Sequence, residues 1–285
     1  MLGAGTMGHG IAQVAAAAGY PVVLRDVNTE ALARGVKSIE RNLAKAIQLG
    51  KITDQERDLT LQRIRGATRL EDIQGVDLVI EAAPENLELK QTLLRENESL
   101  LTDVIFATNT SSLSIDEIAS AAVRPENVVG MHFFNPVHIM RLVEVVVGSQ
   151  TSQTASNTVI DVAKKLKKEP IVVRDVPGFA SSRLGITLGL EAMRMVEQGV
   201  ASARDIDTAM ELGYNHPMGP LRLTDLVGLD VRLNIAEYLH HKLGSETFRP
   251  PEILRRMVSE GKLGKKSGEG FYKWSESGKE QAAAR

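Results

Sequence analysis

The feature that most constrains the fold of this chain is a glycine-rich turn close to its first residue. Gly3, Gly5 and Gly8 follow the pattern GxGxxG, and an apolar helical segment, residues 11–18, comes directly after them. Glycines at these three positions allow a tight turn, close approach of a bound pyrophosphate to the backbone, and close packing of the helix. Such a turn joins a strand to a helix in a parallel sheet, so the pattern predicts an α/β fold.

The next predicted strand, residues 21–26, ends in the acidic residue Asp26. A carboxylate in this position accepts hydrogen bonds from the hydroxyls of an adenosine ribose and repels a 2′-phosphate. The alternative is a glycine-rich turn followed by the capping acid of a helix. The order strand, turn, helix, strand and acid favours a dinucleotide site for NAD rather than NADP, with the contacts Gly3, Gly5, Thr6, Met7, Gly8 and Asp26.

Short apolar, β-branched runs alternate with helical patterns up to about residue 177. This alternation predicts βα units and a largely parallel sheet with strands in residues 21–26, 76–81, 104–108, 128–131, 142–147 and 171–174. Between residues 28 and 70 the pattern is helical throughout, with a break near Gly50 and a capping box from Thr53 to Glu56. We therefore expect a helical hairpin inserted into the sheet domain.

The β-branched runs stop after residue 177. The segments that follow are typical of helices: residues 184–198, 203–212, 224–243 and 252–261. The chain is thus predicted to be an α/β protein with a Rossmann-type doubly wound sheet domain, residues 1–177, followed by an all-α domain, residues 178–285. The helix around residues 184–196 is apolar over much of its circumference, which predicts burial in a homodimer.

A histidine and a glutamate stand in two successive predicted strands. His132 ends one apolar run, and Glu144 lies inside the next, flanked by valines. A histidine there can take a proton from a substrate hydroxyl near neutral pH, and a carboxylate on its far ring nitrogen orients it. A lone His132 would be expected as a satisfied core residue. Because an unpaired Glu144 is costly in apolar surroundings, we expect the two to pair as a catalytic dyad.

Two polar loops follow two other predicted strands. One contains Asn109 and Ser111, and the other contains Glu85 and leads into a helix with Lys90. In an open parallel sheet, the loops at the carboxyl ends of the strands line the ligand crevice. These groups can contact cofactor or substrate. The polar side chains of the loop with Ser111 can equally satisfy the amides of the turn. Glu85 can equally be a helix-capping acid, and Lys90 a solvated base.

Composition excludes several classes of function. The net charge of -2 gives no basic field for nucleic acid, and polar residues, Gly19 and Pro21 interrupt the longest apolar stretch, so no membrane partner is expected. The chain has no cysteine, which removes thiol nucleophiles, disulfides and thiolate metal sites, and we expect no metal. The first residues lead directly into the glycine turn without an export signal, so a cytoplasmic location is expected.

Taken together, seven segments resemble the 3-hydroxyacyl-CoA dehydrogenase family over essentially the whole chain. They are GAGTMGHGIA, EAAPENLELK, TNTSSLSI, HFFNPVHIMRLVEVV, DVPGFASSRL, GYNHPMGPLRLTDLVGLD and LGKKSGEGFYKW. The resemblance implies NAD-dependent, reversible oxidation of a (3S)-3-hydroxyacyl-CoA, in fatty acid β-oxidation or butanoate metabolism, by a homodimer. It also implies His132 as general base with Glu144 as its partner. The remaining contacts implied are Ser111 and Asn135 for substrate, and Glu85, Lys90 and Asn109 for NAD.

The chain departs from the family pattern at two places. Family members have several apolar residues before the first glycine, whereas here only Met1 and Leu2 precede it, so we expect a central strand without its first half. Ser182 stands where the family usually has a substrate-binding asparagine. Two rival interpretations stay open: a dehydrogenase of the same architecture for a sugar acid or another β-hydroxy acid, and a non-catalytic, crystallin-like homologue.

Overall fold

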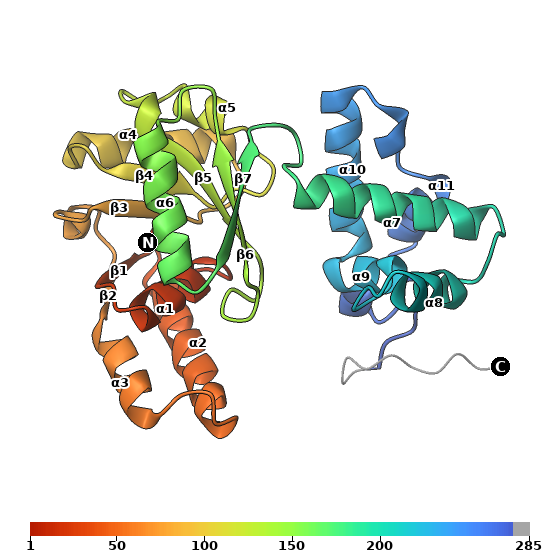
Figure 1. Cartoon of the computed structure of the whole chain (residues 1–285), viewed down its shortest axis with the longest axis horizontal. Helices are drawn as coiled ribbons and strands as arrows, with labels where there is room; N and C mark the ends of the chain where they lie inside the picture. Colours follow the sequence, from red (N-terminus) through yellow and green to blue (C-terminus); the bar gives the residue numbers. More distant parts are fainter. Residues whose placement is uncertain (276–285) are drawn as a thin grey trace. The chain divides into compact units, whose positions relative to one another are not determined.

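The chain divides into two compact units, Met1–Phe179 and Ala180–Arg285, and the computed structural model describes residues 1–275 (Figure 1). The N-terminal unit contains seven strands: β1 (Val22–Arg25), β2 (Ile64–Ala67), β3 (Leu78–Glu81), β4 (Ile105–Thr108), β5 (Val128–Phe133), β6 (Leu142–Val147) and β7 (Glu169–Arg174). Strands β3 to β7 pair in sequence order, and β1 pairs with β2. All pairs are parallel except β5 with β6, which confirms the α/β prediction.

Leu2 joins the two groups of strands. It forms parallel bridges to Arg25 of β1 and to Glu81 of β3, and its amide donates to the carbonyl oxygen of Ile80 at 2.9 Å. The side chain of Leu2 is only 1% exposed. The segment before the glycine turn therefore occupies the central position of the sheet, between β1 and β3.

Helices pack on both faces of the sheet. Residues of α1 (Gly8–Ala17) and α6 (Gln153–Lys165) belong to one buried cluster, and residues of α4 (Leu87–Leu100) and α5 (Ile115–Ala119) belong to another. The short 3₁₀ turns η1 (Glu71–Ile73) and η2 (Pro125–Asn127) connect these elements. Each face buries its own apolar cluster, as a doubly wound sheet requires.

The predicted helical hairpin consists of α2 (Thr29–Gln48) and α3 (Asp54–Gln62). The capping box at its second helix is present, because Thr53 and Glu56 exchange side-chain and backbone hydrogen bonds. The prediction that the helical stretch continues to residue 70 is wrong, because Ile64–Ala67 forms β2. Pairing with β1 satisfies the backbone of that segment, and this tertiary contact overrides the local helical pattern.

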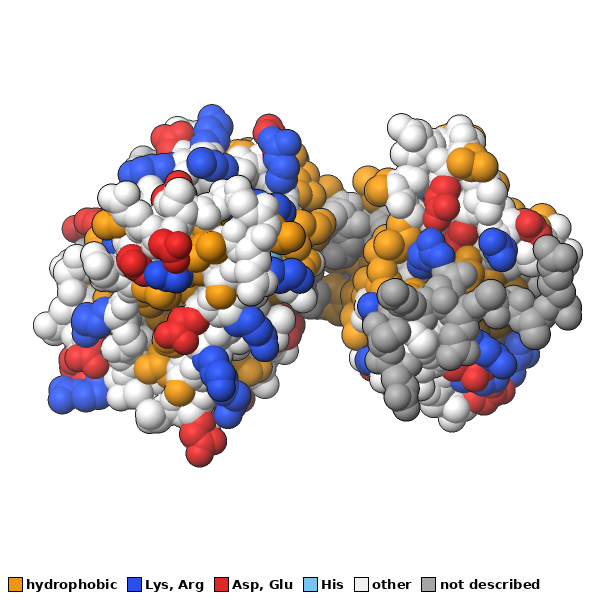
Figure 2. Space-filling view, turned by 90° about the horizontal axis from the view of Figure 1, so that it is seen from below, with side chains coloured by type: hydrophobic (Ala, Val, Ile, Leu, Met, Phe, Trp, Pro, Cys, Tyr) orange, Lys and Arg blue, Asp and Glu red, His pale blue; other side chains and the backbone are white. Residues whose placement is uncertain are grey.

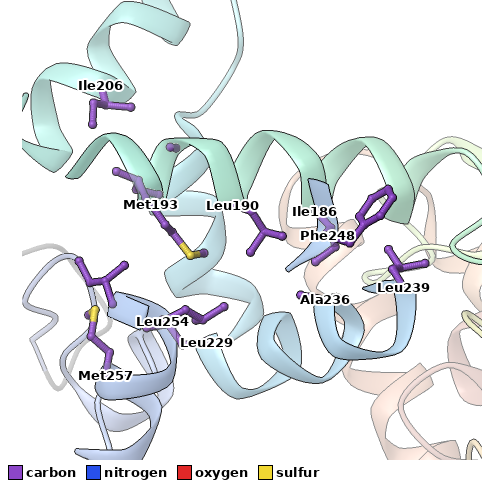
Figure 3. Packing of buried hydrophobic residues seen from close by; sticks show 13 residues of the cluster. Ile186, Leu190, Met193, Ile206, Leu229, Ala236, Leu239, Phe248, Leu254 and Met257 are labelled. Carbon is purple, nitrogen blue, oxygen red and sulfur yellow. The ribbon is translucent and has the colours of Figure 1, made fainter. Parts of the chain in front are cut away.

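The described part of the C-terminal unit is helical: α7 (Ser181–Glu197), α8 (Ala203–Gly213), α9 (Pro220–Val227), α10 (Leu229–Leu243) and α11 (Glu252–Ser259), with 3₁₀ turns η3 (Glu246–Phe248) and η4 (Lys265–Ser267). Figure 3 shows side chains of α7 pointing toward residues of α10 and α11 in one apolar cluster. The prediction of one helix over residues 224–243 is wrong, because Gly228 adopts a φ of 107° and separates α9 from α10.

Two buried aspartates anchor the last described segment to this unit. Asp225 accepts hydrogen bonds from the backbone N–H groups of Phe271 and Tyr272 and from Nε1 of Trp274, at 2.8 to 2.9 Å. Asp207 accepts from the Tyr272 hydroxyl at 2.6 Å. Burial raises the pKa of Asp225, and hydrogen bonds from the three N–H donors oppose that rise. The sequence analysis did not single out either aspartate.

Candidate active site

The predicted contact between His132 and Glu144 is present. The two residues face each other across the antiparallel pair β5 and β6, and His132 Nδ1 lies 2.8 Å from Glu144 Oε2. Glu144 is fully buried and His132 is 7% exposed. Directly opposed residues in an antiparallel pair project from the same face, so the strand register brings these side chains together.

The surroundings of His132 fix the orientation of its ring. Phe134 and Phe179 pack near the imidazole, with ring centroids at 4.5 and 6.0 Å. Because Nδ1 is engaged with Glu144, Nε2 is the ring nitrogen that remains to exchange a proton with a ligand. A carboxylate on Nδ1 also stabilises the protonated imidazole.

The loop after β4 lies beside the end of β5. Asn109 Oδ1 accepts a hydrogen bond from the backbone N–H of Phe133 at 2.8 Å, which ties this loop to the residue after His132. Ser111 is exposed and donates its hydroxyl to Glu85 at 3.2 Å. Asn135, two residues beyond the end of β5, is also exposed. The neighbourhood of His132 therefore contains several polar groups that a ligand can reach.

The glycine turn is closely packed at Gly3 and Gly8 and open at Gly5. Gly3 has a φ of 88°, and a Cβ on Gly8 would stand 1.8 Å from the Gly3 carbonyl oxygen. A Cβ on Gly5, by contrast, would meet no atom within 4 Å, and Gly5 and Thr6 are exposed. Met7, the N-cap of α1, caps no amide with its side chain. The open side of Gly5 and the amides of α1 form a cradle for an anion.

Asp26 lies at the edge of this cradle. Its Oδ2 accepts a hydrogen bond from the backbone N–H of Ala4 at 2.8 Å, and its Oδ1 accepts from the N–H of Asn28 at 3.0 Å. The carboxylate thus holds the glycine turn and the start of α2 together. It remains partly exposed, at the position where an adenosine ribose lies in folds of this type.

Glu85 binds the loop of residues 110–112. Its Oε1 accepts hydrogen bonds from the Thr110 hydroxyl at 2.7 Å and from the backbone N–H groups of Ser111 and Ser112 at 2.8 and 2.9 Å. Burial opposes ionisation of Glu85, but these hydrogen bonds and the charge of Lys90 lower its pKa overall. Glu85, in its ionised form, therefore connects the loop after β3 to the loop after β4.

Lys90 is fully buried, so the alternative of a solvated base is wrong. Its ammonium group donates to both carboxylate oxygens of Glu81, at 2.8 and 3.0 Å, and lies 3.6 Å from Glu85 Oε2. Glu81 was not among the site residues predicted from the sequence, although an acid that ends an apolar β-branched run needs a partner, as Glu144 does.

A second missed residue supports the loop between β5 and β6. Lys168 is 8% exposed and donates to the carbonyl oxygens of Val137 and Met140, in the latter case at 2.7 Å. Burial lowers the pKa of this lysine. Ser182, the second residue of α7, is half-buried in the C-terminal unit.

Comparison with known proteins places the chain among dehydrogenases. Residues 1–176 match the model of the 3-hydroxyacyl-CoA dehydrogenase NAD binding domain, and residues 178–274 match that of the C-terminal domain. The chain belongs to the 3-hydroxyacyl-CoA dehydrogenase family. Family membership makes it an NAD-dependent oxidoreductase of 3-hydroxyacyl-CoA, as the resemblance of the seven segments implied.

Individual relatives support this conclusion. A probable 3-hydroxybutyryl-CoA dehydrogenase of Deinococcus radiodurans is 47% identical over 96% of this chain and 99% of the relative. The mitochondrial hydroxyacyl-coenzyme A dehydrogenase of Sus scrofa is 43% identical over 96% and 90%. The crystal structure of the (S)-3-hydroxybutyryl-CoA dehydrogenase of Ralstonia eutropha has a TM-score of 0.94 at 42% identity, over 96% of this chain and 98% of that one.

The described residues 1–275 also bear on other kinds of site. Within them, no helix combines the length and apolar character needed to span a membrane. The same residues contain no group of three or more His, Cys, Asp or Glu side chains placed to hold a metal ion. On the face of the N-terminal unit seen in Figure 2, acidic and basic side chains are interspersed.

Proposed function

We propose that this dehydrogenase oxidises (3S)-3-hydroxyacyl-CoA reversibly to 3-oxoacyl-CoA, with His132 as general base. The observation that carries the proposal is the 2.8 Å contact between His132 Nδ1 and Glu144 Oε2, in a unit that matches the family's NAD binding domain. Family membership fixes the reaction class. The proposal adds the residues that perform the reaction and the (3S) configuration of the substrate.

In this proposal, His132 Nε2 removes the proton of the substrate hydroxyl. Glu144 stabilises the imidazolium that forms and holds the ring in one orientation. Ser111 and Asn135 hydrogen-bond the oxygens of the substrate, and this positioning supplies the orientation on which hydride transfer depends. NAD, when bound, supplies the hydride acceptor.

The cofactor contacts are proposed from the geometry of the glycine turn and of the two loops. Gly5 and the first amides of α1 receive the pyrophosphate, and Asp26 binds the adenosine ribose. The remaining proposed contacts are Gly3, Thr6, Met7, Gly8, Glu85, Lys90 and Asn109. Lys90 already binds Glu81, so its contribution to the cofactor is made chiefly through Glu85.

We assign NAD binding to residues 1–177, and substrate binding and dimerisation to residues 178–285. Ser182 in the second segment is the proposed counterpart of the family's substrate-binding asparagine. Apolar side chains that are at least 38% exposed lie on four helices of the C-terminal unit: Leu184 on α7, Leu212 on α8, Leu223, Leu226 and Val227 on α9, and Val231 on α10. Solvent-exposed apolar groups on helices favour a homodimer, which sedimentation at micromolar concentration tests.

A panel of substrates tests the function itself. We expect NAD reduction with short and long (3S)-3-hydroxyacyl-CoA thioesters, and none with the (3R) thioesters, the free 3-hydroxy acids or sugar acids. Turnover of sugar acids in preference to thioesters would support the rival dehydrogenase. Absence of turnover with every compound, by a folded protein that binds NADH, would support the crystallin-like homologue.

We also propose that the reaction takes place in the cytoplasm, as part of fatty acid metabolism. The absence of cysteine from the sequence is in keeping with a reducing compartment. Fractionation of cells of the source organism, with the NAD reduction assay applied to each fraction, tests the location.

A further inference from the structure

We propose that Glu81 is a positioning residue which, acting through Lys90 and Glu85, holds the loop of residues 109–112 in the form that binds ligands. The proposal rests on the proposed function, because it takes this loop to be part of the cofactor and substrate site. Glu81 itself is too deeply buried to touch a ligand. It acts through a chain of contacts that runs from the sheet to the exposed loop.

The first part of this chain is the carboxylate of Glu81 at the end of β3. The residue is 0% exposed, and both of its oxygens accept hydrogen bonds. Oε1 accepts from the Lys90 ammonium at 2.8 Å and from the backbone N–H of Ala83, and Oε2 accepts from the Thr108 hydroxyl at 2.7 Å. Glu81 therefore connects β3, β4 and α4 at the carboxyl edge of the sheet.

The second part is the position of Lys90. It lies in the first turn of α4, where the positive end of the helix dipole disfavours a cation. Its burial also removes the hydration of the ammonium group, and apolar residues of similar volume are often as stable as a buried ion pair. Stability of the fold alone therefore gives a weak reason for the pair. Lys90 also donates to the Ala83 carbonyl oxygen at 3.3 Å, and its ammonium lies 3.6 Å from Glu85 Oε2. This contact with a second carboxylate points to another use.

The third part is Glu85, which shares Lys90 with Glu81. Glu85 Oε2 faces the ammonium, while Oε1 accepts from Thr110, Ser111 and Ser112. The charge on Lys90 helps to keep Glu85 ionised, and an ionised carboxylate accepts hydrogen bonds more strongly than a neutral carboxyl. Glu85 in this form fixes the backbone amides of the loop that contains Ser111.

Removal of the negative charge on Glu81 disturbs this arrangement in a defined way. Among the described residues, Glu81 and Glu85 are the carboxylates within 4 Å of the Lys90 ammonium. Without the charge of Glu81, Lys90 is left with Glu85 as its counter-ion and moves toward it. This movement draws the Glu85 carboxylate toward the ammonium on the Oε2 side and away from the loop amides that donate to Oε1, so the loop of residues 109–112 becomes less ordered.

The test compares Glu81→Gln with Glu88→Gln, a matched control at an exposed position of α4, the helix that contains Lys90. Hydrogen exchange of the 109–114 peptide, NADH affinity by fluorescence titration, and kcat and KM for a 3-hydroxyacyl-CoA are measured on the purified full chain. For Glu81→Gln we expect hydrogen exchange of the loop to become about tenfold faster or more. We expect kcat/KM to fall by about tenfold or more, the scale of one hydrogen bond to a charged group. For Glu88→Gln we expect changes of less than about twofold, as for a surface substitution.

Unchanged exchange of the loop in a folded Glu81→Gln protein overturns the proposal. If that variant does not fold, Glu85→Gln decides, because it removes the charge through which Lys90 is proposed to act on the loop, at a side chain that is 35% exposed. Faster exchange of the loop in Glu85→Gln then supports the chain of contacts, and unchanged exchange overturns it. The exchange measurement needs no substrate, so an inactive wild-type chain would refute the proposed function separately.

Discussion

The two units of this dehydrogenase both bury carboxylates, but the partners of those carboxylates differ. In the N-terminal unit, Glu81 binds the Lys90 ammonium and Glu144 binds the His132 imidazole. In the C-terminal unit, Asp225 accepts hydrogen bonds from backbone and indole N–H groups, and Asp207 accepts from N–H groups and a tyrosine hydroxyl. In the first unit these carboxylates pair with titratable bases, and in the second they pair with neutral donors.

This difference separates chemistry from folding. An imidazole or ammonium beside a carboxylate can exchange a proton or shift a neighbouring charge, and both pairs lie next to exposed polar loops. Neutral N–H donors offer no such change of state, so the aspartates of the C-terminal unit hold chain segments together. Substitutions of the buried carboxylates and their partners in the first unit should therefore change the reaction, whereas substitutions of the buried aspartates in the second should change stability.

The largest expected effect is that of His132→Gln. Loss of a general base lowers kcat by about two orders of magnitude or more. NADH affinity should stay within about twofold of the wild type, because the proposed cofactor contacts are untouched. His138→Gln, on the following loop, serves as the matched control and should retain kcat. A parallel loss of NADH binding in His132→Gln would instead show that the pair with Glu144 is structural.

Asp225→Asn should give the largest effect on stability. An amide cannot accept all three N–H donors as well as a carboxylate does, so the unfolding free energy of the C-terminal unit should fall by about 1 to 3 kcal/mol. Trp274, the single tryptophan, reports this unfolding by fluorescence, since its Nε1 donates to Asp225. The folded variant should keep the wild-type NADH affinity. A changed affinity would contradict the division between the units.

Asp26→Ser tests the cofactor side of the N-terminal unit. The substitution removes the carboxylate that repels a 2′-phosphate, so the preference for NAD over NADP should narrow by about tenfold, the scale of one charged hydrogen bond. It also weakens the contact with the Ala4 amide, so NADH affinity should fall. Kd values for NADH and NADPH provide the measurement. A wild type that already uses both cofactors equally would refute this role of Asp26.

The stabilising effects of Glu85 in the N-terminal unit and Asp225 in the C-terminal unit should also change with pH in opposite directions. The pKa of Glu85 lies below its usual 4.5, so its stabilising effect is present above pH 4.5 and is lost as the pH falls through the lowered value. The pKa of Asp225 lies above 3.8, so its ionisation is unfavourable above the raised value and costs nothing below 3.8. Differences in unfolding free energy between wild type and Glu85→Gln or Asp225→Asn, measured from pH 7 to 3, should show these two trends. If both residues changed the unfolding free energy in the same direction with pH, the opposite pKa shifts of Glu85 and Asp225 would be contradicted.

Ser182→Ala should have the smallest effect. A large effect would most directly contradict the difference between the two units. A serine hydroxyl offers one neutral hydrogen bond, so kcat/KM should fall by less than about tenfold, and Ser182→Asn should keep or raise it. A hundredfold loss in a folded Ser182→Ala protein would place essential chemistry in the C-terminal unit. Steady-state kinetics with a thermal unfolding control distinguish these outcomes.

The sequence by itself determined the features that depend on local pattern. The spacing of Gly3, Gly5 and Gly8 predicted the turn, because a positive φ and a missing Cβ are properties of single residues. The pairing of His132 with Glu144 followed from the cost of an unpaired acid in an apolar strand. The capping box at Thr53 was equally local.

Only the tertiary structure decided which distant groups meet. Pairing with β1 made residues 64–67 a strand against their helical surroundings, and the positive φ of Gly228 divided a continuous helical pattern. Lys90 was compatible with a solvated surface until β3 placed Glu81 beside it. The burial of a charge depends on the neighbours that the fold supplies, and for that reason the sequence predicted the contact between His132 and Glu144 but not the contacts of Glu81 and Lys90 behind the loop of residues 109–112.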